Sequence, residues 1–291
     1  MYKNTKEHKE AVAEAKEASK EARQWEREAK QILGSIDKQV KEELENIKKQ
    51  GKESIGDIVK QTQTQMRISE LWSDALRLHN EDKYEEACDR YSKIEPLTGK
   101  KPVAELYYNW GNALFDLAKI KKDENLFEQA RQKYEQAIKI KPNYYQAYSN
   151  YGNALSNRAV LKGNEELFKE ACGKYAKAVE IKPDEYIPYI CWSNALLSWA
   201  KLKKGTPEYE GLLKQTEEKC LKTESLKTGK GAYNLACFYA IRENTEECKK
   251  WLLAGQEANE LVTRDKAMKD SDLENVRGEA WFKEIKWKGE K

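Results

Sequence analysis

The sequence predicts an all-α protein in which pairs of helices stack into a solenoid. Two observations predict it. Similar side chains recur at a 41-residue spacing through the middle of the chain, and the apolar positions inside each copy follow helical spacing. A chain that repeats itself at intervals of about 20 to 50 residues forms one small structural unit per copy and buries its core by stacking the copies.

Composition allows such a fold and limits the classes of partner. The 291 residues include eight Trp and sixteen Tyr, which supply buried surface that a disordered chain would lack. The 53 Lys and Arg against 50 Asp and Glu leave a formal charge of +3. A protein that follows a nucleic-acid backbone usually carries a much larger positive charge, so nucleic acid is not the expected partner.

Four columns of side chains define the first half of the repeat. They are Tyr107, Tyr148 and Tyr189; Trp110, Tyr151 and Trp192; Gly111, Gly152 and Ser193; and Asn112, Asn153 and Asn194. In the second half, Ala130, Tyr134, Ala137 and Pro142 recur as Ala171, Tyr175, Ala178 and Pro183. Each half has helical spacing and a polar break separates them, which predicts two helices joined by a turn. The proline ends the second helix because it cannot continue the hydrogen-bond ladder.

These positions resemble the tetratricopeptide repeat, in which an aromatic, a large apolar residue and Gly are followed by Ala, an aromatic, Ala and Pro. The resemblance implies a right-handed superhelix. Repeats of that family have about 34 residues, so the 41-residue copies carry about seven more. We expect this extra length to extend both helices, near 118–122 and 159–163, and to enlarge the turn between them.

The repeats define the domain organisation. They fall near residues 68–97, 103–142, 144–183, 185–226 and 231–258, which gives a solenoid of about five helix pairs over 67–260. Residues 261–291 are expected to form a C-terminal capping helix, with Leu273, Val276, Trp281, Phe282 and Ile285 set among charges. Such a cap covers the apolar face that the last repeat would otherwise expose.

Residues 1–66 follow a different period. Trp25, Ile36, Ile47 and Ile58 are 11 positions apart, as are Leu33, Leu44, Ile55 and Met66. Eleven residues in three turns keep a stripe on one helix face, so we expect an amphipathic helix, or a hairpin bent between Gly51 and Gly56. The stripe would pack on the first repeat or on a second copy of the protein. It could instead lie on a membrane surface or form a stalk, but its polar face is not strongly basic.

No constellation of residues predicts chemistry. The two histidines, His8 and His79, lie in different segments, and the sequence has no Gly-rich phosphate loop, HExxH or CxxC motif. We therefore expect no catalytic residue, no metal site and no cofactor: the protein is not predicted to be an enzyme. Six cysteines without a paired motif, and no apolar run of about 20 residues, predict a cytoplasmic protein with buried thiols.

In the family that the sequence resembles, the residue that follows the Gly of the first helix points into a concave groove that binds protein segments. Here that residue is Asn112, Asn153 or Asn194. The same face is expected to carry Tyr108, Phe115, Asp116, Ser149, Ser156, Asn157, Ile190, Leu197 and Ser198, with Tyr233 and Cys237 beyond. Asn side chains can donate to and accept from the backbone of an extended peptide. The alternative is that they only bond to adjacent helices or to water.

The predicted function is a scaffold that binds a peptide segment or helix of a partner protein. If the Asn column binds the partner, changing all three to Ala should abolish binding and leave the melting temperature nearly unchanged.

Tetratricopeptide-repeat proteins that bind the acidic C-terminal tails of chaperones have Lys where Tyr108, Ser149 and Ile190 stand in this sequence. The absence of those lysines argues against such a tail as the ligand. Lys119, Lys121 and Lys122, with Lys201, Lys203 and Lys204, could form a basic rim for an acidic partner. The alternative function is a membrane-peripheral assembly factor tethered through the N-terminal helix.

Overall fold

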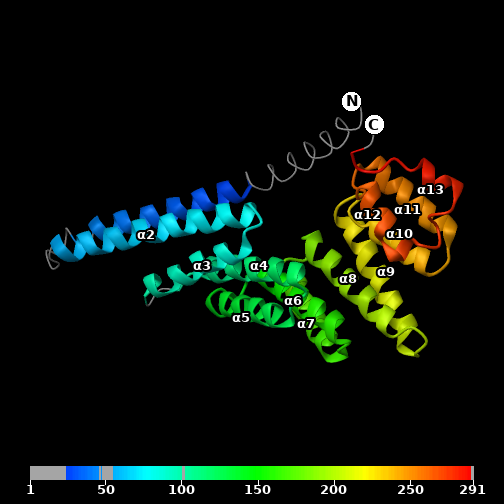
Figure 1. The fold of residues 1–291 in the computed structure, drawn as a ribbon, viewed down its shortest axis with the longest axis horizontal. Helices are drawn as coiled ribbons and strands as arrows, with labels where there is room; N and C mark the ends of the chain where they lie inside the picture. Colours follow the sequence, from blue (N-terminus) through cyan, green and yellow to red (C-terminus); the bar gives the residue numbers. More distant parts are fainter. Residues whose placement is uncertain (1–23, 46, 48–54, 100–101, 290–291) are drawn as a thin grey trace. The chain divides into compact units, whose positions relative to one another are not determined.

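A computed structural model describes residues 24–45, 47, 55–99 and 102–289 (Figure 1). Within these ranges every regular element is an α-helix or a short 3₁₀-helix, as predicted. The chain divides into two compact units, Met1–Leu106 and Tyr107–Lys291.

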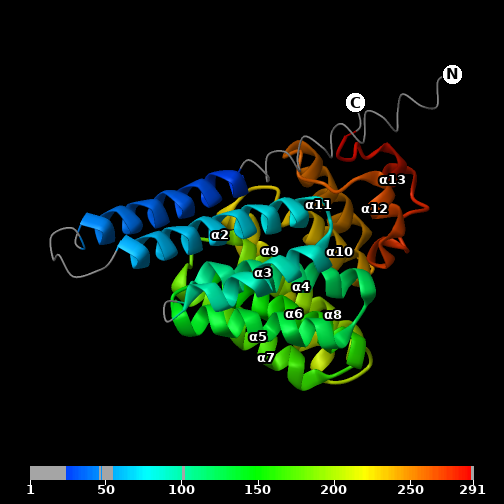
Figure 2. The same ribbon diagram turned by 60° about the vertical axis from the view of Figure 1, so that its left-hand side comes forward.

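The N-terminal unit contains a helical hairpin followed by the first repeat. A helix over residues 24–45 lies antiparallel to α2 (Ile55–Asn80), with the Trp25 and His79 rings 6.5 Å apart (Figures 1 and 2). The bend expected between Gly51 and Gly56 lies mostly outside the described residues. α2 runs unbroken through position 66, where we expected the solenoid to start, so one helix serves both the hairpin and the first repeat.

The second half of α2 packs on α3 (Tyr84–Ile94), which continues into η1 (Glu95–Thr98). The ring of Trp72, which is buried in α2, meets that of Tyr91 edge-on at 6.4 Å. This pair is the repeat of ordinary length that the sequence predicts near 68–97.

Four further helix pairs follow in the C-terminal unit, except that the first three residues of α4 belong to the N-terminal unit, and they complete the expected five. They are α4 (Ala104–Lys121) with α5 (Glu124–Ile140), α6 (Tyr145–Lys162) with α7 (Glu165–Ile181), α8 (Tyr186–Leu202) with α9 (Glu208–Leu226), and α10 (Ala232–Ile241) with α11 (Thr245–Glu257). Successive helices from α5 to α8 lie side by side in both views (Figures 1 and 2).

The glycines of the first helices lie against the tyrosines of the second helices at the centre of the α4–α5 and α6–α7 pairs. A Cβ on Gly111 would lie 2.6 Å from Cε1 of Tyr134, and one on Gly152 would lie 2.7 Å from Cε1 of Tyr175. Both tyrosines are completely buried. Glycine is therefore needed because the tyrosine ring of the second helix lies directly on the backbone of the first.

The extra length of the middle repeats goes into the helices, as predicted. α4 and α6 have 18 residues each, and α5 and α7 have 17. The expectation of an enlarged turn is wrong for these two repeats, because only residues 122–123 and 163–164 separate the helices. Asp123 and Asn164 cap the following helices by accepting from the backbone N–H groups of Asn125 and Glu166, at 2.8 and 2.9 Å.

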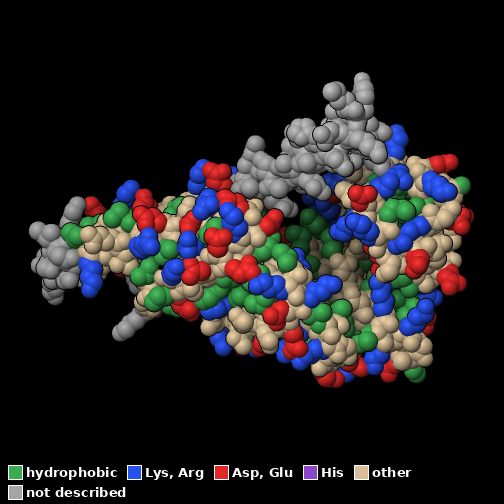
Figure 3. Space-filling view, in the orientation of Figure 1, with side chains coloured by type: hydrophobic (Ala, Val, Ile, Leu, Met, Phe, Trp, Pro, Cys, Tyr) green, Lys and Arg blue, Asp and Glu red, His purple; other side chains and the backbone are tan. Residues whose placement is uncertain are grey.

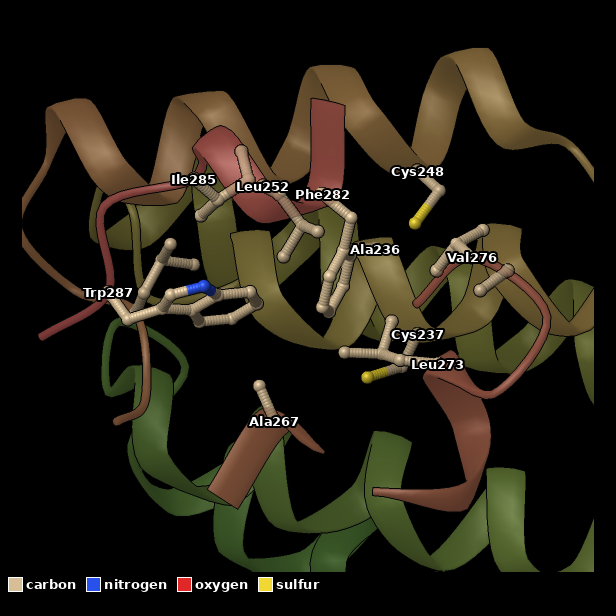
Figure 4. Packing of buried hydrophobic residues seen from close by; sticks show 12 residues of the cluster. Ala236, Cys237, Cys248, Leu252, Ala267, Leu273, Val276, Phe282, Ile285 and Trp287 are labelled. Carbon is tan, nitrogen blue, oxygen red and sulfur yellow. The ribbon is translucent and has the colours of Figure 1, made fainter. Parts of the chain in front are cut away.

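The C-terminal segment covers the last helix pair, but not as the single helix that we expected. It consists of α12 (Arg264–Lys269), η2 (Ser271–Leu273) and α13 (Ala280–Glu284), joined by turns. Leu273, Phe282 and Trp287 point into a core shared with Leu252 and Ala236 (Figure 4). The segment is thus held by side chains spread along a folded-back chain.

Among the helices in the described ranges, none combines the length and the apolar character needed to cross a lipid bilayer.

Candidate functional site

The first two asparagines of the predicted column bind buried tyrosines. Tyr134 donates its hydroxyl hydrogen to Oδ1 of Asn112 at 2.9 Å, and Tyr175 donates to Oδ1 of Asn153 at 2.8 Å. Burial raises the pKa of both tyrosines well above the ordinary value, so the hydroxyls stay protonated and act as donors. Each of these amide oxygens therefore joins the two helices of its own repeat.

Asn150 links the polar groups of neighbouring repeats. Its Nδ2 donates to Oδ1 of Asn112 at 2.9 Å and to the Tyr108 hydroxyl at 3.2 Å. Its own Oδ1 accepts from Nδ2 of Asn153 at 3.3 Å. Sequence reasoning missed this residue, although Asn109 stands 41 positions before it and the spacing would have found it.

Asn194 is placed differently because its repeat lacks the tyrosine. Thr216 stands where Tyr134 and Tyr175 stand, and its hydroxyl donates to the carbonyl of Leu212. Asn194 is exposed, and its Oδ1 accepts from Nδ2 of Asn234 in α10 at 2.7 Å. The structure thus changes our expectation for the triple Ala variant, which should be less stable. Losing Asn112 leaves the buried Tyr134 hydroxyl without its acceptor, and losing Asn153 leaves the Tyr175 hydroxyl with only Ser156 Oγ, at 3.4 Å.

The remaining predicted residues lie on the first helices, and several of them take part in packing. The Tyr108 ring lies 4.9 Å from that of Tyr144, and the Phe115 ring 5.6 Å from that of Phe127. Asp116 pairs with Lys119, Ser149 and Leu197 are buried, Ile190 is half-buried, and Tyr233 donates to Asp270 at 2.7 Å. These contacts do not gather the predicted residues into one site.

A hollow between α6 and α8 does bring five of the residues expected on the groove face together. It has a volume of about 340 Å³. Its lining is Asn153, Ser156, Asn157 and Val160 from α6, with Cys191, Asn194, Ala195 and Ser198 from α8. The residues expected on the groove face that line it are Asn153, Ser156, Asn157, Asn194 and Ser198. Val160, Cys191 and Ala195 were not predicted.

Polar atoms with spare hydrogen-bonding capacity line this hollow. Among the described residues, Oδ1 of Asn157, Nδ2 of Asn194 and Oγ of Ser198 have no intramolecular hydrogen bond, whereas Nδ2 of Asn157 donates to the carbonyl of Asn153 at 2.9 Å. The lining thus offers an acceptor on α6 and a donor on α8. Burial raises the pKa of the Cys191 thiol, so that side chain adds no charge.

A second, more apolar hollow adjoins the first. It has a volume of about 410 Å³ and is lined by Val160, Phe168, Ser198, Lys201 and Leu202. Val160 and Ser198 belong to both hollows, and Val160 is 57 % exposed and Leu202 48 % exposed. Together the two hollows form a surface that is polar at one end and apolar at the other.

The lysines near the ends of the first helices are largely neutralised within the chain. Lys119 pairs with Asp116 at 2.8 Å, Lys201 with Asp272, and Lys203 with Glu165. The pKa of Glu165 is lowered, first by its hydrogen bond from Lys203. The basic rim that the sequence suggested is therefore weaker than a count of lysines indicates.

One group of metal-ligand-type side chains occurs among the described residues, at the start of the cap. Sγ of Cys237 and carboxylate oxygens of Asp270 and Asp272 lie within 4.8 Å of one another. Tyr233 donates to Asp270, and Lys201 pairs with Asp272. Burial, and then the charge of Asp270, raises the pKa of Cys237 well above its usual value. These contacts satisfy the carboxylates by fastening the cap to α8 and α10.

Comparison with known structures agrees with this architecture. The crystal structure of TTC0263, described as a thermophilic TPR protein of Thermus thermophilus, is 16 % identical with a TM-score of 0.50, and the match covers 71 % of this chain and 94 % of that one. MamA from residue 41 to the end, from Desulfovibrio magneticus RS-1, is 16 % identical with a TM-score of 0.49 over 70 % of this chain and 98 % of that one. No protein-family model and no curated protein sequence matches the chain. The chain is therefore a helical repeat protein with the tetratricopeptide-type superhelical fold.

Proposed function

We propose that the protein is a non-enzymatic interaction scaffold that binds an extended segment of a partner protein across the α6 and α8 hollow. The observation that carries the proposal is the pair of unused amide atoms, Oδ1 of Asn157 and Nδ2 of Asn194, on opposite sides of that hollow. A peptide backbone offers one N–H donor and one carbonyl acceptor per residue. It is thus complementary to both atoms at once.

The adjoining apolar hollow gives the proposed ligand a second feature. Val160, Phe168 and Leu202 provide an apolar surface next to Ser198, which can bond the ligand backbone. A segment with one large uncharged side chain beside a free stretch of backbone would fit both parts. An acidic tail would not, because Lys201 and Lys203 already have carboxylate partners.

Affinity capture from the native host tests this proposal, since it does not require the partner to be named first. The test variant combines Asn157→Ala, Asn194→Ala and Ser198→Arg, which removes both amides and places a bulky charge where the hollows join. The control is Asn125→Ala, which removes the amide of an exposed asparagine on α5, away from the hollow. Proteins retained by the wild type and the control, and lost from the test variant, would support the groove. Equal retention by all three would contradict it.

Membrane tethering, the alternative function, has less support from the N-terminal helix. Between residues 24 and 45 the chain has six acidic and four basic side chains. A helix that lies on anionic lipid usually has a strongly basic polar face. The small net charge of this segment therefore gives no attraction to such a surface.

A further inference from the structure

In the outer part of the N-terminal hairpin, the residues that the structure describes form no buried core. None of the described side chains of the helix over residues 24–45 is buried, and the first buried residue among the described positions of α2 is Ile68. Beyond that point, α2 buries Leu71, Trp72 and Ala75 in the first repeat. Two helices alone rarely bury enough apolar surface to be stable, so the outer part is incomplete as it stands.

A groove lined by apolar side chains and by polar ones such as Thr62 and Gln65 runs between the two helices of the hairpin. Two hollows of about 500 and 400 Å³ follow one another along it and share Val40, Thr62 and Gln65. The side chains of the 11-residue stripe line them: Leu33, Ile36, Leu44, Ile47, Ile58 and Met66. Met66 is 54 % exposed, and the other five side chains are half-buried. The stripe is thus an apolar surface that the hairpin covers only in part.

The charges beside the groove are mixed in sign and paired along the helix. Lys30 pairs with Glu26 at 2.5 Å and Lys38 with Glu42 at 3.8 Å. Figure 3 shows basic and acidic side chains intermixed over the described part of the hairpin, with apolar patches between them. Neither anionic lipid nor nucleic acid is attracted by such a surface. A second hairpin of the same sequence carries the same mixture of charges, so it meets little net repulsion.

We propose that two copies of the protein associate through their hairpins and form a four-helix bundle. Each copy lays the stripe of its helix over residues 24–45 in the groove of the other. In a two-fold arrangement every contact occurs twice, and the 11-residue period that both copies share brings apolar rows into register. The stripe becomes the bundle core, as apolar stripes do in four-helix proteins. This inference is independent of the α6 and α8 groove.

The size of the surface agrees with a stable pair. A helix of about 22 residues is roughly 33 Å long and two adjacent helices are about 20 Å wide. One face of the hairpin therefore presents on the order of 650 Å², close to the roughly 800 Å² per partner of ordinary specific interfaces. Association in the micromolar range is the expectation.

Measuring the mass of the full chain by light scattering on a sizing column tests the proposal. From about 1 to about 100 µM, where interfaces of this size associate, we expect a shift from one to two copies. Ile36→Glu with Val40→Glu should shift the association at least tenfold toward the monomer. Gln39→Glu, an exposed position on the same helix, should leave it unchanged. Far-UV circular dichroism shows whether the variants keep their helices.

Three results would overturn the proposal. The first is a wild-type chain that stays monomeric at about 100 µM, and the second is a dimer that the double variant does not weaken. The third comes from a parallel measurement with vesicles of mixed phosphatidylserine and phosphatidylcholine. If the wild type sediments with them and the double variant does not, the stripe binds lipid and not a second copy.

Discussion

The amide oxygens of Asn112 and Asn153 each accept a hydrogen bond from a tyrosine that is completely buried. Changing Asn112 to Ala leaves the Tyr134 hydroxyl without its acceptor. We expect a loss of about 1 to 3 kcal/mol in the free energy of unfolding, measured by denaturant titration. Asn194→Ala is the comparison, since that side chain is exposed and should change stability by less than about 0.5 kcal/mol. Equal effects would show that the tyrosine bonds do not contribute as proposed.

Two glycines make a matched pair for a second prediction at the scale of single residues. Gly152→Ala places a methyl group against the ring of Tyr175, whereas Gly173, which is exposed in α7, has no atom within 4 Å of an added Cβ. The first change should destabilise by about 1 to 3 kcal/mol, although Ala favours helix. The second should stabilise by up to about 1 kcal/mol. Thermal denaturation of both variants would reveal the opposite signs, and a common sign would refute the packing argument.

The sequence predicted which residues recur but not how their atoms are used. The 41-residue columns correctly indicated that Gly111 and Tyr134 serve packing. The spacing places Thr216 where the tyrosines stand, but it could not show that Asn112 and Asn153 accept hydrogen bonds from those tyrosines, because the two side chains belong to different helices. That Oδ1 of Asn157 and Oγ of Ser198 lack an intramolecular hydrogen bond can be recognised only from the structure, in which α6 and α8 lie side by side.

At the scale of helices, ion pairs join the lengthened ends of α5 and α6. Glu124 accepts from Lys162 at 2.6 Å and from Arg158 at 3.1 Å. The hydrogen bond from Lys162, opposed by partial burial and aided by Arg158, lowers the pKa of Glu124 below 4.5. A carboxyl group with a lowered pKa stabilises the fold at pH values above 4.5, and this contribution disappears as the pH falls through its folded pKa.

Melting temperatures of the wild type and Glu124→Gln, measured against pH, test this link. We expect the variant to melt at a lower temperature at about pH 6, and the difference to vanish near pH 3, where the carboxyl is protonated in both states. Added salt should reduce the difference at the higher pH. A difference that does not depend on pH would assign the effect to packing.

The ends of elements were the hardest part to predict. A two-residue turn suffices for the middle repeats because Lys122 and Gly163 adopt positive φ values of 51° and 61° and the next residue caps the following helix. In the C-terminal segment, Leu273, Val276, Phe282 and Ile285 lack a sustained helical period. A single helix could therefore not have buried them together.

For the molecule as a whole, the 41-residue period predicted the solenoid, because stacking needs only a repeated apolar face. The resemblance to the tetratricopeptide repeat added the first and last of the five helix pairs. The period did not predict that α2 would belong to both the hairpin and the first repeat. The 11-residue period of the hairpin completes three turns at nearly the natural helical pitch. Both patterns therefore fit one straight helix, and the change of pattern near Met66 did not require a break.

The C-terminal cap should determine how well the solenoid resists unfolding from that end. Trp287 is 2 % exposed, and its ring lies 5.2 Å from that of Phe282 in the terminal core. Trp287→Ala should cost about 3 to 5 kcal/mol and expose apolar surface that binds a fluorescent dye such as ANS. Lys288→Ala, an exposed neighbour, should do neither. If the tryptophan variant kept the wild-type unfolding curve, the cap would have no role in stability.

The central claim is that a partner segment lies in the hollow between α6 and α8. Photo-crosslinking in the native host addresses it most directly, with a benzophenone amino acid placed at Ser198, which lines the hollow, or at Gly173, which is exposed on α7. We predict a discrete covalent adduct with a partner protein from position 198 and none from position 173. An adduct from position 173 alone, or no adduct from position 198, would contradict the account.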